Sequence, residues 1–263
     1  EESSYLNLGL VLVKDPCLSF LCESETFKLY KVKMKQLLMI LFLFGVGNLA
    51  FAEQVEYPSS LRFEGSIKAF EKSEKEQSTP KGAIVVTGSS TIRMWETIKT
   101  DLKPLTVIPR GFGGSNMNDL YHYSHELIIK HKSRAVVIYE GDNDLVDGIS
   151  PEQIHHKFLE LKNKLLKSDE NLRIYVISVK PSIARKYFLD KAKEVNGLFK
   201  KTCALNEQLF FIDTFSQMME GDEIKSDVFI KDKLHYNKRG YEIWSKTIRP
   251  ILLKHELKYE QIQ

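Results

Sequence analysis

The sequence Ala83-Ile84-Val85-Val86-Thr87 is a short apolar run that ends directly at Gly88-Ser89-Ser90. A strand that is covered on both faces has this appearance, because neither set of alternating side chains meets water. The run therefore predicts a strand inside a parallel sheet. The small residues after it predict a turn into a helix, with serine as a preferred N-cap.

Similar segments recur along the chain and alternate with helical periodicity. Further strands are predicted at Leu105–Pro109, Ala135–Tyr139, Ile174–Ile177 and Phe210–Ile212. Helices are predicted at about 63–75, 117–131, 151–165 and 190–205, and from about 237 onward. The helix after Ser150 has the strongest start signal, because Ser150-Pro151-Glu152-Gln153 combines a capping box with proline in the first turn. This alternation predicts an α/β domain with a five-stranded parallel sheet and right-handed crossovers.

The composition excludes several classes of protein. The 263 residues include 38 Lys plus Arg and 35 Asp plus Glu, which gives a formal net charge of +3. A balance this close to neutral offers no electrostatic case for a nucleic-acid partner. Three cysteines are too few for a disulfide scaffold or a zinc cluster.

The N-terminal region resembles a secretory signal peptide. Met34-Lys35 is a short basic start, Leu37–Phe44 is apolar, and Ala50-Phe51-Ala52 matches a cleavage signal. We expect cleavage after Ala52 and an exported protein, periplasmic or secreted. A membrane anchor over Gln36–Ala52 is the alternative, although 17 residues are few for a bilayer span.

These signals divide the chain into four parts. We expect residues 1–33 to be a non-native upstream extension without a structural role, and residues 34–52 to be the signal peptide. Residues 53–82 would form an N-terminal helix and linker, and residues 83–263 one α/β domain with no stable membrane span after cleavage.

Polar residues and glycines follow the predicted strands. They lie in Gly88–Ile92, Arg110–Ser115, Glu140–Leu145 and, late in the chain, Asp232–Asn237. Singly, each segment has an ordinary structural explanation as a helix cap, a turn that needs glycine, or a polar loop. Ligands of parallel sheets, however, bind beyond the carboxyl ends of the strands, so these segments are expected to meet.

Together the segments contain what ester hydrolysis requires. Ser90 can be the nucleophile and His235 the base that takes its proton. Asp232 lies three residues before His235, so a turn can bring its carboxylate to the far ring nitrogen. The backbone N–H groups of Ser90 and Gly114, with the side-chain amide of Asn143, can donate to an oxyanion.

With these four blocks in this order, the sequence resembles the GDSL-like, or SGNH, hydrolases over about residues 63–255. The resemblance implies a flavodoxin-like three-layer α/β/α sandwich and serine esterase chemistry without a cofactor or metal. It implies Ser90, Asp232 and His235 as the catalytic residues, and Ser90, Gly114 and Asn143 as the oxyanion donors. Two positions depart from the usual pattern: Ser89 replaces the aspartate before the nucleophile, and Asp142 adds a negative charge that could disfavour anionic substrates.

Three alternatives accompany the esterase hypothesis. The α/β-hydrolase fold is excluded, because the chain has no G-x-S-x-G elbow. A catalytically silent module that binds glycans or lipids would keep the fold. A metal held by Asp142, Asp144, Asp232 and His235 would support phosphoester hydrolysis.

The substrate follows less directly from the sequence. Short acyl groups on a carbohydrate are favoured over lysophospholipids or thioesters, because no long apolar insertion could form a lid. The loop Val179–Lys186 should border the site; its basic residues, Lys180, Arg185 and Lys186, are interpreted as a solvated surface. The expected partner is a small-molecule or glycan ester.

Overall fold

The fold is described from a computed structural model that covers residues 32–36 and 54–260. Residues 32–36 form a short helical segment, and the chain from Gln54 onward forms a separate unit. The predictions for residues 1–52 otherwise lie outside the described residues. Within residues 32–36 and 54–260, no helix is long and apolar enough to cross a membrane.

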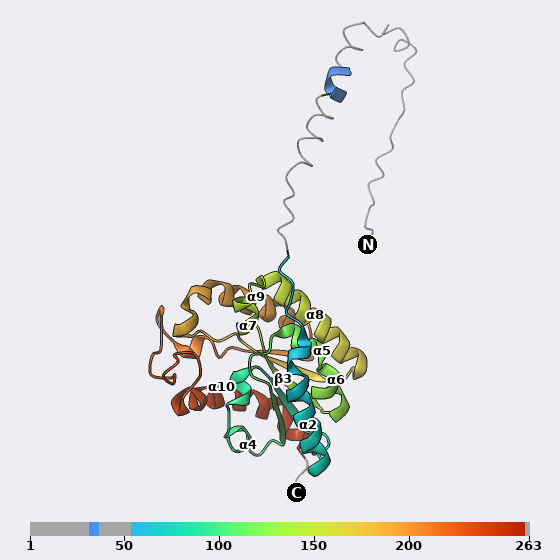
Figure 1. Cartoon of the computed structure of the whole chain (residues 1–263), viewed down its shortest axis with the longest axis vertical. Helices are drawn as coiled ribbons and strands as arrows, with labels where there is room; N and C mark the ends of the chain where they lie inside the picture. The colour runs from blue at the N-terminus through green and yellow to red at the C-terminus, as the bar shows by residue number, and fades with distance from the viewer. Residues whose placement is uncertain (1–31, 37–53, 261–263) are drawn as a thin grey trace, which may run out of the picture. The chain divides into compact units, whose positions relative to one another are not determined.

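A five-stranded, all-parallel sheet forms the centre of the unit (Figure 1). Its strand order is β2-β1-β3-β4-β5. The strands are β1 (Ile84–Gly88), β2 (Val107–Gly111), β3 (Ala135–Tyr139), β4 (Arg173–Ile177) and β5 (Leu209–Ile212). All five predicted strands are confirmed, with small shifts at their ends. The register pairs Gly88 with both Gly111 and Tyr139, so three strands end together at one edge.

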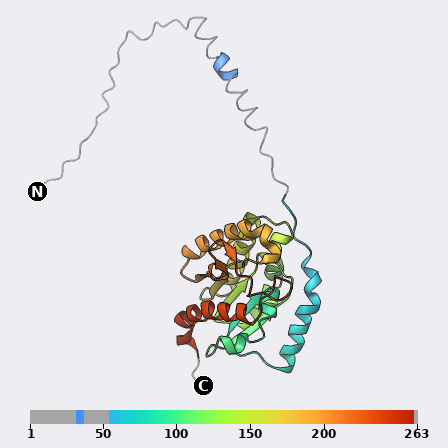
Figure 2. The same cartoon turned by 90° about the vertical axis from the view of Figure 1, so that its left-hand side faces the viewer.

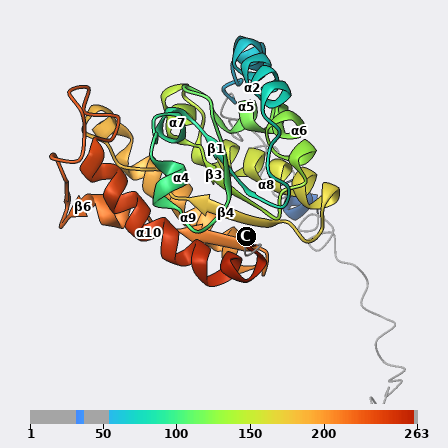
Figure 3. The same ribbon diagram turned by 90° about the horizontal axis from the view of Figure 1, so that it is seen from below.

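Helices cover both faces of the sheet. One face carries α2 (Glu64–Glu76), α5 (Met117–His122), α6 (Ser124–Leu127), α8 (Pro151–Ser168) and α9 (Leu189–Ala204). The other carries α3 (Ser90–Arg93), α4 (Ile98–Asp101) and α10 (Lys238–Glu256). Figures 2 and 3 show α2 and α10 on opposite sides of the strands. This three-layer arrangement confirms the predicted fold class.

Alternating strand residues feed two separate cores. In β1, Val85 packs with the α8 and α9 side, whereas Ile84 and Val86 pack with the α10 side. The second core is rich in aromatic side chains, because Trp95 lies against both Tyr241 and Trp244. Burial on both faces is why the strand sequences are apolar without alternation.

The prediction of one helix over 117–131 is wrong. The segment is broken into α5, α6 and a 3₁₀ turn, η3 (Ile129–His131). The Ser124 hydroxyl donates to the carbonyl of Tyr121 at 2.8 Å, and Ile128 leaves helical geometry at φ −127°. Serine side chains that bond nearby carbonyls compete with the helical ladder, which periodicity alone does not reveal.

Several short elements were not predicted. They are α4 (Ile98–Asp101) and α7 (Asp142–Val146), the 3₁₀ segments η2 (Ser60–Phe63), η4 (Ile183–Phe188), η5 (Ser216–Met218) and η6 (Leu257–Tyr259), and the antiparallel pair β6 (Met219–Glu220) and β7 (Glu223–Ile224). Two of them, α7 and η4, are the next elements along the chain after β3 and β4. They therefore lie where parallel sheets place their ligands.

Candidate active site

The turn after β1 presents Ser90 at the carboxyl edge of the sheet. Gly88 has φ +142°, and a Cβ there would overlap the carbonyl oxygen of Tyr139 in the neighbouring strand. Only glycine fits this close approach. Ser89 is then extended, and Ser90 begins α3 with its side chain partly exposed. The nucleophile candidate therefore stands on a rigid strand end.

The loop before α10 brings His235 to Ser90. An isolated bridge joins Phe229 to Tyr236, and the backbone N–H of Ile230 donates to the carbonyl of His235 at 2.9 Å. Lys233 adopts φ +57°, which tightens the loop. Immediately afterwards, Asn237 caps α10 by accepting a hydrogen bond from the Gly240 N–H. The helix start thus holds the histidine in place.

Ser90, His235 and Asp232 form one hydrogen-bonded chain. The distance from Ser90 Oγ to His235 Nε2 is 2.8 Å, and that from His235 Nδ1 to Asp232 Oδ2 is 2.6 Å. The backbone N–H groups of Leu234 and His235 both donate to Asp232 Oδ1 at 2.9 Å. The structure therefore brings together the three residues that the sequence selected for catalysis.

Hydrogen bonds stabilise the negative charge on Asp232. Desolvation alone would raise its pKa, but the hydrogen bonds from the His235 ring and from two backbone N–H groups lower the pKa to about 2. Hydrogen bonds to a carboxylate stabilise its charged form. Asp232 is thus ionised at neutral pH and can hold the His235 ring with Nε2 toward the serine.

Two of the three oxyanion candidates have unused donors. Neither the Ser90 N–H nor the Gly114 N–H donates a hydrogen bond to the described part of the chain. Gly114 has φ +88°, is exposed, and has no atom within 4 Å of the position that a Cβ would take. Unpaired backbone donors next to a nucleophile are what an oxyanion requires.

The third candidate, Asn143, joins three of the sequence blocks. Its Nδ2 lies 2.7 Å from both Ser89 Oγ and the carbonyl oxygen of Ser115. Both amide hydrogens therefore already have acceptors. A reacting oxygen would therefore share or replace one of these two acceptors.

The loop after β4 borders the site, but not as a solvated basic surface. Lys180 is 3% exposed and its Nζ lies 3.1 Å from Asp142 Oδ2; Arg185 Nη1 lies 2.8 Å from the same oxygen. The solvated interpretation is wrong for these two residues, since only Lys186 is exposed. The loop also reaches the histidine loop, where the Ala184 N–H donates to the Lys233 carbonyl at 3.1 Å.

The two cations also correct the expectation for Asp142. Burial would raise its pKa, but Lys180 and Arg185 outweigh burial and lower it. Asp142 is therefore ionised, and its single negative charge faces two positive charges. The Arg185 guanidinium balances this charge, so Asp142 does not present an unpaired negative charge beside the site.

Two buried acids, Glu140 and Asp144, contact the loop Arg110–Ser115 and the start of α5; the sequence offered Asp144 only as a metal ligand and gave Glu140 no role. Glu140 accepts from Ser115 Oγ at 2.5 Å, and Asp144 Oδ1 accepts from the Met117 N–H at 3.0 Å and from Tyr57 Oη–H at 3.1 Å. Burial raises the pKa of Asp144 to about 7 and that of Glu140 well above its ordinary value. Their positions at a strand end were the only available signal.

The four residues of the metal hypothesis do not converge. Asp142 pairs with cations, Asp144 with Met117 and Tyr57, and Asp232 with His235. Across residues 32–36 and 54–260, no three histidine, cysteine or acidic side chains are grouped to hold a metal. Cys203 is buried, and burial raises the pKa of its thiol to about 12, so it is not a reactive thiolate.

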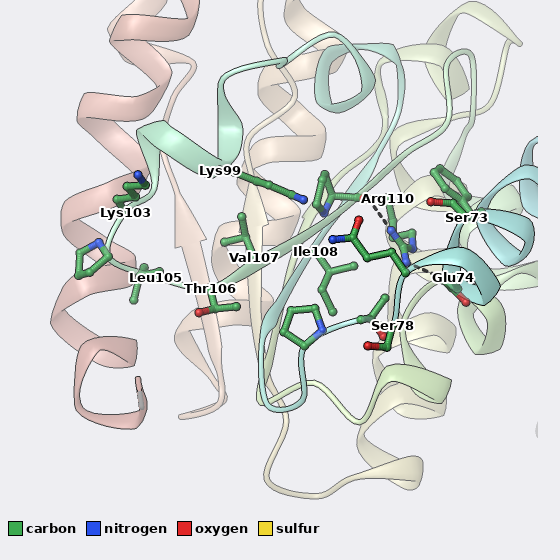
Figure 4. A pocket seen from close by; sticks show the side chains of 16 residues that line it. Ser73, Glu74, Ser78, Lys99, Lys103, Leu105, Thr106, Val107, Ile108 and Arg110 are labelled. Carbon is green, nitrogen blue, oxygen red and sulfur yellow. Dashed lines mark hydrogen bonds and ion pairs between the residues drawn. The ribbon is translucent and has the colours of Figure 1, made fainter. Parts of the chain in front are cut away.

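A cavity of about 610 Å³ lies along the outer edge strand, β2 (Figure 4). Val107 and Ile108 line its floor, and the Arg110 guanidinium at its end is paired with Glu74 at 2.6 Å. None of its lining residues belongs to the Ser90–His235–Asp232 chain. The cavity is therefore not part of the candidate active site.

The family described as GDSL-like Lipase/Acylhydrolase matches residues 87–243, more than half of the sequence. The chain belongs to this family. The match begins in β1 and includes all four sequence blocks. No curated protein matches the sequence.

Solved structures share the fold of this GDSL-like protein. A proposed platelet activating factor from Streptococcus pneumonia is 16% identical, with TM-score 0.65 and coverage of 73% of this chain and 94% of its own. A GDSL-like lipase from Bacteroides thetaiotaomicron is 19% identical, with TM-score 0.60 and coverage of 72% and 97%. A family 3 carbohydrate esterase from Talaromyces cellulolyticus is 14% identical, with TM-score 0.55 and coverage of 68% and 100%.

Proposed function

We propose that this protein is a serine esterase that hydrolyses carboxylic esters through an acyl-enzyme. The proposal rests on one observation above all: the continuous hydrogen-bonded chain from Ser90 through His235 to Asp232. A serine alone is a weak nucleophile, and an adjacent base held in place by a carboxylate activates it. Family membership supports the same chemistry.

The acylation step follows from the geometry. Ser90 Oγ attacks the ester carbonyl carbon while His235 Nε2 takes the hydroxyl proton. The carbonyl oxygen becomes an oxyanion that can accept from the N–H groups of Ser90 and Gly114 and from the Asn143 amide. When the intermediate collapses, the C–O bond to the alcohol breaks and His235 returns the proton to the departing oxygen.

Deacylation reverses the roles of the same groups. Water attacks the acyl carbon while His235 takes one of its protons, and the bond to Ser90 Oγ then breaks as His235 protonates that oxygen. The carboxylic acid leaves and the resting state returns. Asp232 stays ionised throughout and stabilises the positively charged ring of His235.

We further propose short acyl groups on a carbohydrate as the substrate, and action outside the cytoplasm. The fold shared with a carbohydrate esterase supports the first part. Asp232 is partly exposed, and Arg185 and Asp142 lie beside Asn143. This polar, open surrounding suits an ester of a polar alcohol such as a sugar. The sequence prediction of a signal peptide supports the second part. Lysophospholipid or thioester hydrolysis, or silent glycan or lipid binding, are the alternatives.

The test compares the full chain with Ser90→Ala on p-nitrophenyl acetate, butyrate and decanoate. We expect wild-type hydrolysis to be fastest with acetate and to fall about 1,000-fold or more in the variant, since nucleophile loss leaves only residual catalysis. Ser73→Ala, an exposed serine on α2, is the matched control. Acetate release from an acetylated oligosaccharide tests the carbohydrate proposal separately.

Equal hydrolysis by wild type and Ser90→Ala would refute the serine mechanism. A folded wild type that hydrolyses no ester and is not labelled at Ser90 by a fluorophosphonate would favour the binding module. Preference for decanoate would move the substrate from carbohydrates to lipids.

A further inference from the structure

Arg185 occupies an unusual position for a cation near an active site. It lies in η4, on the loop after β4, and its side chain is only 18% exposed. The loop is fixed there by two backbone hydrogen bonds, from the Ala184 N–H to the Lys233 carbonyl and from the Arg185 N–H to the Ser182 carbonyl. The guanidinium is thus held next to the loop that carries the catalytic histidine.

The guanidinium reaches two consecutive residues of α7. Nη2 donates to Asn143 Oδ1 at 2.9 Å, and Nη1 forms an ion pair with Asp142 Oδ2 at 2.8 Å. Lys180 contributes a second cation to Asp142. The ion pair with Asp142 orients the planar fork, so that the other arm faces the amide oxygen of Asn143.

This contact decides which way the Asn143 amide faces. With Oδ1 on a cation, Nδ2 must face Ser89 Oγ and the Ser115 carbonyl. The reversed amide would place Nδ2 against the guanidinium and Oδ1 against a carbonyl oxygen, which are two repulsive contacts. A positive charge on the amide oxygen also polarises the amide, which strengthens its N–H donors.

We propose that Arg185 is a positioning residue for the oxyanion donor: it holds the Asn143 amide with its N–H groups toward the nucleophile block and strengthens them as donors. The inference rests on the proposed function, because it assigns Arg185 a part in the same site. It adds a residue from a fifth segment, the loop after β4, to a site that the sequence located in four blocks.

The experiment measures kcat and KM on p-nitrophenyl acetate for Arg185→Met, Asn143→Ala and the double variant, beside wild type and Ser90→Ala. Loss of one oxyanion donor costs about 100- to 1,000-fold in kcat, and we expect Asn143→Ala to fall in that range. Arg185→Met should lose about 10-fold or more in kcat with little change in KM, because the donor matters most in the transition state. The double variant should be no slower than Asn143→Ala.

Two further variants separate positioning from general stability. Lys186→Met removes an exposed cation from the same loop, whose partner is Glu223 at 3.6 Å, and should keep wild-type kcat. Arg185→Lys keeps the charge beside Asp142 but cannot bridge two acceptors with one planar group. It should remain folded and still lose kcat, so it decides the outcome if Arg185→Met does not fold.

The outcomes distinguish this inference from the proposed function. Wild-type kcat in both Arg185 variants, or a double variant whose loss is the product of the single losses, would overturn the role of Arg185 while Ser90-dependent hydrolysis stands. Absence of Ser90-dependent hydrolysis in wild type would overturn both. A KM increase at unchanged kcat would assign Arg185 to ground-state binding and contradict positioning.

Discussion

Asp232 and Asp144 are both aspartates in loops around the proposed site, yet their surroundings push them in opposite directions. Asp232 is 41% exposed in its side chain and accepts hydrogen bonds from His235 and two backbone N–H groups. Asp144 is fully buried, with Oδ2 unpartnered within the described residues. The pKa is about 2 for Asp232 and about 7 for Asp144.

The comparison distinguishes Asp232, whose role depends on its negative charge, from Asp144, whose role is structural. Water and N–H donors stabilise an ionised carboxylate, whereas burial next to other acids favours the protonated form. Glu140 resembles Asp144 in this respect, because its raised pKa also follows from burial and from the neighbouring acid. Glu140 and Asp144 therefore support the fold, while Asp232 serves the proposed chemistry.

The largest effect should come from removing the charge of Asp232, and it should appear in kcat. Asp232→Asn removes the charge that orients and stabilises the His235 ring, and the same change in another serine hydrolase costs about 10,000-fold. We expect kcat on p-nitrophenyl acetate to fall about 100- to 10,000-fold, while thermal unfolding shows that the variant is still folded at the assay temperature. Asp190→Asn, which alters an exposed acid, is the control. A variant with wild-type kcat would remove Asp232 from the catalytic chain.

The second effect concerns Asp144 and the pH dependence of the free energy of unfolding. The folded-state pKa of Asp144, about 7, lies above the ordinary 3.8, so the folded state holds the proton more tightly. Stability from this group is therefore complete below about pH 4 and is lost as the pH rises through 7. Asp144→Asn should flatten this decline between pH 5 and 8.

The size of that decline can be bounded. A pKa difference of one corresponds to about 1.4 kcal/mol, so wild type should lose on the order of 1 to 4 kcal/mol more than Asp144→Asn over this interval. Urea unfolding at pH 5 and pH 8 measures it, with Asp190→Asn as the matched control. An identical decline in Asp144→Asn and wild type would show that Asp144 does not titrate in this range.

The smallest effect should come from Tyr57, whose hydroxyl donates to Asp144 at 3.1 Å. Tyr57→Phe removes one hydrogen bond and leaves the ring in place. We expect a loss of about 0.5 to 1.5 kcal/mol in the free energy of unfolding at pH 8, and less at pH 5, where the protonated acid is a weaker acceptor. Equal losses at both pH values would mean that the acid's charge does not govern the contact.

Much of the fold could be predicted because its signals are local. The five strands are continuous apolar runs, and the start of α8 follows from Ser150 and Gln153, whose side chains and backbones form the predicted capping box. The break within 117–131 was not predictable from periodicity, since it depends on how one hydroxyl, that of Ser124, competes with the helix.

By itself, the sequence determined the sheet, its edge and the residues proposed for chemistry. Asp232 and His235 lie three residues apart, and fold class with family resemblance placed Ser90 at a strand end. Only the tertiary structure decided what surrounds them. Arg185 meets Asn143 across 42 positions and Tyr57 meets Asp144 across 87. Periodicity shows which face of an element is buried but not which polar side chains share that space; their protonation and orientation depend on the folded surroundings.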